Sequence, residues 1–169
     1  AASVTLQNVR LTNFTGEGIL VTPGTTNTSL YVRDSRITGT ASAIVLTSTG
    51  GAIKAQIDNT RIDANSSGLT IGSSNVIASI SNSVIANSGS ALFANGAGTI
   101  NASRNVIARN TTGARVGVSG GTINLSQNAF DDNTTAINFV AGGTVSSAGN
   151  NSIIGAPGLA PNGPAIAFR

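Results

Sequence analysis

The chain has 169 residues and a formal net charge of +3, with nine basic side chains, six acidic ones, 21 glycines and neither histidine nor cysteine. The missing histidine and cysteine exclude imidazole bases, thiolate nucleophiles, disulfides and the usual zinc sites. The small net charge and the few aromatic rings argue against nucleic-acid binding, which depends on phosphate neutralisation and base stacking. No apolar run is long enough to cross a bilayer, so we expect no membrane span.

A hydrophobic anchor recurs seven times, at intervals of 22 to 26 residues. The anchors are Leu11, Ile37, Ile62, Ile85, Ile107, Phe130 and Ile153. Alternating apolar positions precede each anchor, as Val4 and Leu6 do in the first copy, and the same offsets select Ser146 and Ala148 in the last copy. This alternation is typical of strands with one buried face.

A second alternating stretch follows each anchor after a polar bend. It begins with a small residue, which is Gly18, Ala43, Gly68, Ala91 or Ala136. The matching stretch of the fifth copy, residues 114–118, fits only if one residue is bulged out. The bends carry residues that adopt a left-handed backbone at low cost. These are Asn13, Gly39, Asn65, Asn87, Asn110 and Asn133.

Units of about two dozen residues cannot close a core alone, but stacked units pair with their neighbours. We therefore predict an all-β chain that forms a right-handed parallel β-helix of about seven coils, roughly 30 to 35 Å long. Residues 1–169 form one domain in this prediction, with a last strand at residues 165–168. Residues 155–165 are expected to fold over the last coil as a partial cap.

The ends of such a solenoid are open sheet edges, which proteins normally cover. No capping helix is visible at either end of the chain. We therefore expect a segment of a larger or processed protein, or coil ends that self-associate or meet another surface protein.

Two residues before the anchor, a polar column becomes Asn105, Asn128 and Asn151 in the later copies. With this column, the coil pattern resembles the pectin-lyase-like superfamily of right-handed parallel β-helices. That resemblance implies the fold but no single activity, because the group includes pectate lyases, polygalacturonases, phage tailspikes and surface adhesins. The three amides are predicted to form a structural ladder, in which each side chain donates to and accepts from the next coil.

Catalysis would depend on few groups. The acidic residues are Glu17, Asp34, Asp58, Asp63, Asp131 and Asp132. Polygalacturonase-like hydrolases combine an Asp-Asp pair with histidine and Arg-x-Lys motifs, and this chain has only the pair, which we interpret as a solvated turn. A glycosidase places two carboxyl groups across one bond, whereas Asp63 and Asp131 are expected three coils apart, roughly 14 Å.

Pectate-lyase-like chemistry needs a calcium site built from several carboxylates. The best acidic cluster, Asp34, Asp58 and Asp63, occupies different offsets in its coils and is mixed with arginines. We therefore predict no catalytic residue, no metal site and no cofactor.

The most unusual surface feature is an arginine one residue before the anchor in three consecutive copies, at Arg10, Arg36 and Arg61. A mixed-charge solvated face is the plain interpretation of this column. The sharper hypothesis is a site for an acidic polysaccharide, to which the outward-facing Tyr31 would contribute. A partly apolar outward stripe is also expected on the second stretch, at Leu20, Val45, Thr70 and Phe93, where either another protein or a flanking segment would pack.

These observations favour a non-catalytic β-solenoid that serves as a structural or adhesive module of a secreted or cell-surface bacterial protein. The alternative is a polysaccharide-active β-helix of the lyase or glycosidase type, or the non-catalytic part of one. The absence of cysteine fits a bacterial secreted protein. Whether the chain is an enzyme stays open at this point, although the scarcity of catalytic groups favours a binding role.

Overall fold

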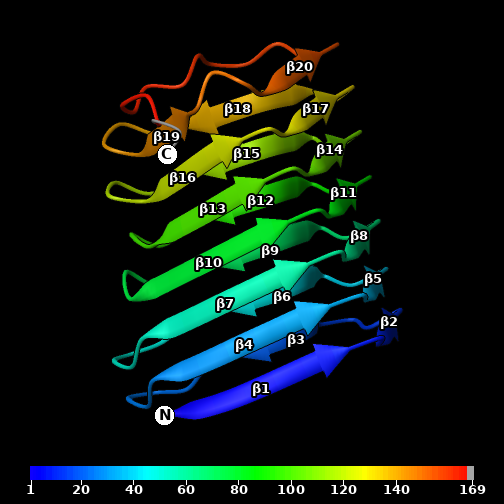
Figure 1. Cartoon of the computed structure of the whole chain (residues 1–169), viewed down its shortest axis with the longest axis vertical. Coiled ribbons are helices and arrows are strands. Elements are labelled where there is room, and N and C mark those ends of the chain that lie inside the picture. The colour runs from blue at the N-terminus through cyan, green and yellow to red at the C-terminus, as the bar shows by residue number, and fades with distance from the viewer. Residues whose placement is uncertain (167–169) are drawn as a thin grey trace.

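The computed structural model describes residues 1–166, and these residues form a solenoid of short strands with no helix among them. Figure 1 shows the coils stacked along the long axis, with the N-terminus at one end and residues 155–166 crossing the other. All strand pairs are parallel and join three sheets, A, B and C. The predicted all-β parallel solenoid of about seven coils is confirmed.

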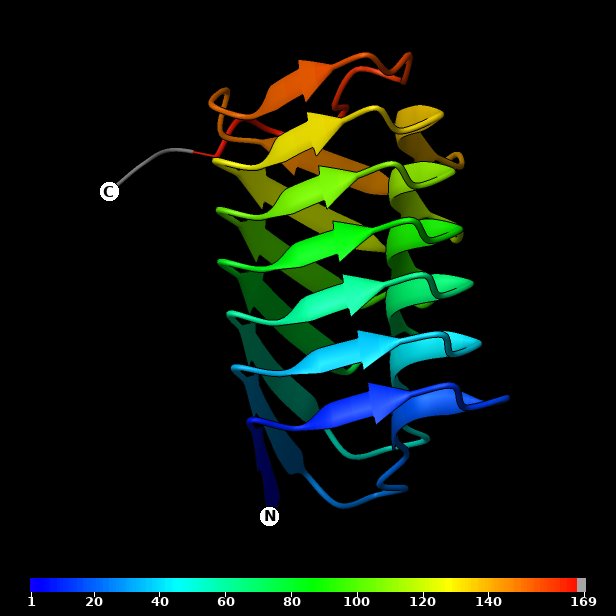
Figure 2. The same cartoon turned by 90° about the vertical axis from the view of Figure 1, so that its right-hand side faces the viewer.

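Each of the first six coils contributes one strand to each sheet in turn, and the last described coil contributes strands to sheets A and B only. Sheet A consists of β1 (Ala2–Gln7), β4 (Thr28–Arg33), β7 (Ile53–Asp58), β10 (Val76–Ser81), β13 (Thr99–Ser103), β16 (Thr122–Ser126) and β19 (Thr144–Ser147). Sheet B, which faces the viewer in Figure 2, consists of β2 (Arg10–Thr12), β5 (Arg36–Thr38), β8 (Arg61–Asp63), β11 (Val84–Ala86), β14 (Val106–Ala108), β17 (Ala129–Asp131) and β20 (Ser152–Ile154). Sheet C consists of β3 (Glu17–Val21), β6 (Ser42–Leu46), β9 (Ser67–Ile71), β12 (Ser90–Ala94), β15 (Thr112–Val116) and β18 (Thr135–Phe139).

The inward columns of the three sheets form one apolar core. In sheet B, Ile37, Ile62 and Ile85 are successive partners across the strand pairs and are fully buried. Full burial of such a side chain stabilises the fold by about 1.5–3 kcal/mol relative to exposure. Because successive coils lie only about 4.8 Å apart, each side chain packs on its equivalents above and below.

The small residue at the second position of each sheet C strand is required by close packing. A Cβ atom on Gly18 would lie 2.8 Å from the carbonyl oxygen of Ala43 in the next coil. In the fifth coil Gly113 occupies this position, and Ala114 pairs directly with Leu92. The predicted bulge over residues 114–118 is therefore wrong, because the small residue lies one position earlier than the sequence pattern indicated.

Each coil bends twice through a single residue with positive φ. The bend between sheets A and B uses Asn8, Asp34, Asn59, Asn82, Arg104 and Gln127. The bend after sheet B uses Asn13, Gly39, Ala64, Asn87, Arg109, Asp132 and Gly155. Asparagine, aspartate and glycine predominate because a left-handed backbone costs them least.

The predicted left-handed bends are right at Asn13, Gly39 and Asn87 but wrong at three positions. At Asn65, Asn110 and Asn133 the preceding residue takes the positive φ instead. The three asparagine side chains are then free to turn inward, where they are buried.

The first polar ladder follows the bend between sheets A and B. Asn105 donates its backbone N–H and its Nδ2 to Asn128 Oδ1, at 3.1 and 3.0 Å. Asn128 donates in the same way to Asn151 Oδ1, at 2.8 and 3.0 Å. Ser83 and Thr60 continue the column, since each gives its backbone N–H to the side chain of the next coil. Asn105, Asn128 and Asn151 thus stack from coil to coil.

A second ladder, absent from the sequence-based expectations, follows the bend after sheet B. Ser88 donates its backbone N–H to Asn110 Oδ1 at 2.9 Å. Asn110 donates its backbone N–H and Nδ2 to Asn133 Oδ1, both at 3.0 Å. Thr40 and Asn65 make the equivalent contact nearer the N-terminus. At both corners of the core, side chains therefore accept hydrogen bonds from the backbone N–H groups at the bends of the preceding coil.

The last coil departs from the repeat. Val145 pairs with Ile123, whereas Asn128 still bonds to Asn151, so one extra residue lies between β19 and β20. The predicted inward pair, Ser146 and Ala148, is therefore shifted by one position, and Val145 is the fully buried residue. Gly149, with φ of 76°, lies in the widened bend.

Residues 155–166, which we call the closing segment, lie across the last coil as expected of a partial cap. Pro157 accepts a bond from Ala136 N in β18, and Gly163 N donates to Val145 O in β19. No strand is formed at residues 165 and 166, and the remainder of the predicted final strand, residues 167 and 168, lies outside the described residues.

The first ladder predicts a specific loss of stability. The side chain of Asn128 takes part in four hydrogen bonds and is 2% exposed, so the Asn128→Ala substitution leaves buried donors and a carbonyl group without partners. We expect the free energy of unfolding to fall by about 2–4 kcal/mol, measured by urea denaturation. The control is Asn124→Ala on the outer face of the neighbouring strand, which should cost less than about 1 kcal/mol. Equal losses for the two variants would contradict the ladder's role.

Candidate functional site

The arginine column occupies the outer face of sheet B in the first three coils. Arg10 pairs with Arg36, and Arg36 pairs with Arg61, so the three side chains share one register position on β2, β5 and β8. All three residues are exposed. The same column continues as Val84 and Val106 in the next two coils, so the positive charge ends at the third coil.

An open groove of about 490 Å³ runs beside this column. The arginines form one wall, and the other wall consists of the bend residues, Asn8, Asp34, Asn59 and Asn82. Three guanidinium groups and one carboxylate line it, so the groove is electropositive. Its long direction follows the solenoid axis, because the lining residues come from equivalent positions in successive coils.

The arginines differ in how far their charge is neutralised. Arg61 Nη2 lies 2.9 Å from Asp63 Oδ2, which makes an ion pair within one coil. Among residues 1–166, no carboxylate lies within ion-pair distance of Arg10 or Arg36. Arg10 and Arg36 therefore carry charges without an ion pair among the described residues, and Arg36 lies at the centre of the column.

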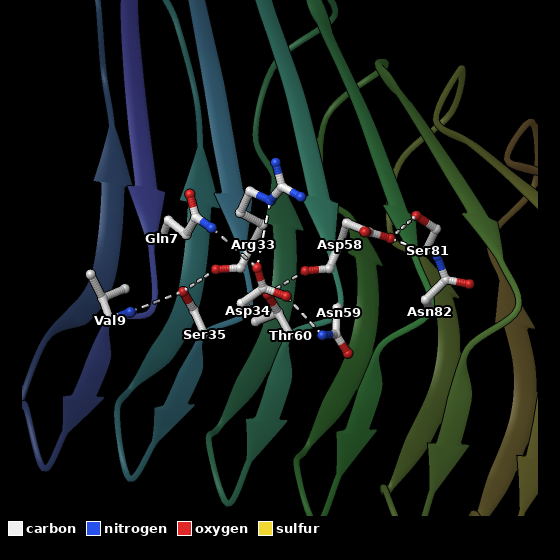
Figure 3. A network of polar contacts seen from close by, with 10 residues as sticks. All are labelled: Gln7, Val9, Arg33, Asp34, Ser35, Asp58, Asn59, Thr60, Ser81 and Asn82. Carbon is white, nitrogen blue, oxygen red and sulfur yellow. Dashed lines mark hydrogen bonds and ion pairs between the residues drawn. The ribbon is translucent and has the colours of Figure 1, made fainter.

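Each aspartate on this side of the molecule is held by amides or hydroxyl groups of neighbouring coils. Figure 3 shows Asp34 accepting from Asn59 Nδ2 at 2.8 Å and Asp58 accepting from Asn82 Nδ2 at 2.7 Å. Asp63 accepts from Asn87 Nδ2 at 2.7 Å in the same manner. The contacts of Asn59 and Asn82 orient these bend side chains in the wall of the groove opposite the arginines, whereas Asn87 lies outside the groove.

The same contacts stabilise the charged form of two carboxylates. Hydrogen bonds from Ser81 and Asn82 hold the pKa of Asp58 below its ordinary value. Burial acts to raise the pKa of Asp63, but the bonds from Asn87 and Arg61 outweigh it and the pKa is lowered. Both residues are thus kept as anions, unlike a general acid, whose pKa must be raised.

Tyr31 lies in a different groove. Its half-exposed ring is on the outer face of sheet A, where a groove of about 610 Å³ is lined by Tyr31, Arg33, Gln56 and Asp58, among others. The bend residues separate the two grooves. The structure therefore brings Arg10, Arg36 and Arg61 together but does not place Tyr31 beside them.

The carboxylates do not gather into a site. Among residues 1–166, no group of three acidic side chains is close enough to hold a metal ion. Asp63 and Asp131 share a column with Ala86 and Ala108 between them, three coils apart as expected. Asp132 is a bend residue with positive φ.

The predicted apolar stripe is present on sheet C. Leu20, Val45, Thr70 and Phe93 are successive partners, and the guanidinium of Arg115 follows at 4.7 Å from the centroid of the Phe93 ring. Leu20, 53% exposed, is the most accessible of the four. The cation–π contact covers one end of the stripe.

The bend residues Asn8, Asn59 and Asn82 are groove residues that the sequence prediction missed, whereas it named Asp34 only as part of an acidic cluster. Asn8, Asp34, Asn59 and Asn82 all lie three residues before an anchor, so the repeat alignment carried the signal.

A comparison with protein families bears on the whole coil array. The model of a family described as the right handed beta helix region matches residues 1–153. The chain belongs to this family. The match confirms the predicted hand of this β-helix and agrees with the pectin-lyase-like resemblance. No curated protein and no solved structure matches the chain. Within residues 1–166 of this β-helix there is no helix of the length and hydropathy that a membrane span requires.

The hydrogen bonds to Asp58 predict a measurable change in its titration. Removing a donor with Ser81→Ala should raise the pKa of Asp58 towards its ordinary value of 3.8, as followed by NMR. Because the folded pKa lies below the unfolded one, the contribution of Asp58 to stability is present above the unfolded pKa and is lost as the pH falls through the folded pKa. The stability difference between wild type and Ser81→Ala should therefore shrink on strong acidification.

Ser79→Ala, on the same face of β10, serves as the matched control and should leave the titration of Asp58 unchanged. A pKa of Asp58 that is the same in wild type and Ser81→Ala would contradict this assignment.

Proposed function

We propose that this β-helix is a non-catalytic binding module that holds an acidic polysaccharide along the arginine column. We further propose that it belongs to a secreted or cell-surface bacterial protein, in which such binding would serve adhesion or attachment. The observation that carries the proposal is the placement of Arg10, Arg36 and Arg61 in one register column along one wall of a single groove.

The spacing of the column suits a polymer that runs along the solenoid axis. Successive guanidinium groups arise from strands about 4.8 Å apart, close to the length of one pyranose unit. A guanidinium binds a carboxylate through two parallel N–H donors, which is a geometry that lysine cannot supply. Each coil would thus meet one sugar unit of a uronate chain.

The opposite wall offers uncharged hydrogen-bonding groups for hydroxyls. Asn8 and Asn59 lie across the groove from Arg10 and Arg61, and Asn59 is already oriented by its bond to Asp34. An array of carboxylate-binding arginines facing hydroxyl-binding amides matches the chemistry of an acidic sugar. The same wall would also repel dense anionic clusters through Asp34, which favours singly charged uronates over phosphates.

The arrangement of acids supports binding rather than turnover. Asp34, Asp58 and Asp63 are each bonded to amides or hydroxyl groups, and Asp58 and Asp63 have lowered pKa values. Among the residues that line the arginine groove, Asp34 alone carries a carboxyl group, so no second carboxyl group faces it across the groove. The polysaccharide-active alternative predicts that unsaturated or reducing ends appear when the protein is incubated with acidic glycans, and their release would overturn the non-catalytic proposal.

The binding test uses Arg36→Ala at the centre of the column. Affinity for a polyuronate, measured by isothermal titration calorimetry, should fall at least about tenfold, because one bidentate charged contact contributes about 1.5–3 kcal/mol. Wild-type binding should also weaken as salt is added.

The matched control is Arg109→Ala, which removes the same charge from an exposed position outside the groove. This variant should bind within about twofold of wild type. Equal losses for Arg36→Ala and Arg109→Ala would indicate attraction by net charge alone, and no binding by wild type to any acidic glycan would reject the proposal.

A further inference from the structure

The arginine column stops inside the coil array, between the third and the fourth described coil. Arg61 pairs with Val84 across β8 and β11, and Val84 pairs with Val106 across β11 and β14. Val84 still lines the groove, whereas Val106 lies outside it and is 44% exposed. Because both flanking coils are described, this boundary is the same whatever precedes residue 1. A ligand that follows the column therefore passes from guanidinium donors to an aliphatic side chain that offers no hydrogen bond.

In the third coil, the opposite wall of the groove keeps a hydrogen-bonding atom for a ligand. Asn59 donates Nδ2 to Asp34 Oδ1 at 2.8 Å, and among residues 1–166 its own Oδ1 has no hydrogen-bond partner. Figure 3 shows this oxygen turned away from Asp34. Asn59 Oδ1 is therefore available to accept a hydrogen bond from a sugar hydroxyl in the groove.

In the fourth coil, the equivalent amide is engaged by charged partners on both sides. Asn82 donates Nδ2 to Asp58 Oδ1 at 2.7 Å, and its Oδ1 accepts from Arg104 Nε at 3.0 Å. A carboxylate at one end and a guanidinium at the other make these bonds charge-assisted and fix the orientation of the amide. A ligand hydroxyl would have to compete with these partners. At the fourth coil, both walls of the groove therefore offer less to an acidic sugar than they do at the third.

On the basis of the binding role proposed above, we infer that Val84 is the specificity-determining residue that ends the recognition of acidic sugar units. The substrate class is a run of adjacent uronates, each of which meets one arginine of the column. A unit that lies over Val84 gains neither a charged contact nor a free amide oxygen. A carboxylate at this position would be placed against aliphatic surface without a partner, which is unfavourable for a charged group. The run of recognised units therefore stops at the fourth coil.

The test measures how the affinity of the 169-residue chain depends on the length of a uronate oligomer, by isothermal titration calorimetry. In wild type the affinity should rise at least about fivefold with each unit that reaches an arginine. It should stop rising beyond three units, the number of arginines in the column. A tetramer has two ways of placing three units on the column, so it should bind at most about twofold more tightly than a trimer.

The Val84→Arg substitution continues the column by one coil. The new side chain takes the register position that Arg61 holds in the preceding coil, so the fold already accommodates arginine there. The ratio of tetramer to trimer affinity should rise to at least about fivefold. The matched control is Val106→Arg, which adds the same charge one coil further on, outside the groove, and should keep the wild-type ratio.

A second pair of variants tests the opposite wall. Asn59 and Asn82 both have positive φ, so glycine replaces either of them without backbone strain. Asn59→Gly removes the available oxygen and should weaken trimer binding at least about threefold, whereas Asn82→Gly should stay within about twofold of wild type.

Three results would overturn the role of Val84 while leaving the binding role intact. The first is a tetramer-to-trimer ratio that Val84→Arg leaves unchanged, and the second is an equal rise in Val106→Arg. The third is a wild-type affinity that keeps rising about fivefold with each unit beyond the third. Equal losses for Asn59→Gly and Asn82→Gly would contradict the difference between the two walls. Absence of binding by wild type to every oligomer would reject the binding role itself, and the role of Val84 with it.

Discussion

The fold depends on one constraint, which is that each coil must supply hydrogen-bond partners for the buried polar groups of the coil before it. A parallel sheet satisfies the backbone along its strands, but the bends leave N–H groups buried at the corners. In this chain a side chain of the next coil accepts their hydrogen bonds. Asn128 Oδ1 accepts from Asn105 N–H, and Asn133 Oδ1 accepts from Asn110 N–H. Stacking in register is therefore required for the corners as well as for the apolar columns.

This constraint separates the inside of the molecule from the outside. The buried positions of the described coils contain aliphatic residues, Phe130 and neutral polar side chains, and they contain no ionised group. Chemistry is left to the outward columns, where a residue type repeated in consecutive coils becomes a linear array. The arginine column is such an array, and its groove exists because the left-handed bend residues project beside it.

Much of this architecture could be predicted from sequence, since the anchor spacing, the alternation and the asparagine column each report a local rule. The outward register of Arg10, Arg36 and Arg61 followed from their fixed distance to the anchor. The errors arose where a position is set by packing between coils. Gly113 replaces the expected small residue because of close approach to its neighbours, and Asn110 turns inward because Arg109 takes the left-handed conformation. The separation of Tyr31 from the arginines depends on the bend between two sheets, which no alternation pattern reports.

Hydrogen exchange of side-chain amides tests the central constraint most directly. The Nδ2 protons of Asn110 and Asn128 are each shared between a carbonyl of the preceding coil and the amide of the next, at 2.9 to 3.0 Å. If the ladders close the corners, these protons should exchange by NMR as slowly as the backbone amides of the buried strands. The Nδ2 protons of Asn95, an exposed residue, should exchange rapidly. Rapid exchange at Asn110 and Asn128, equal to that at Asn95, would contradict the account.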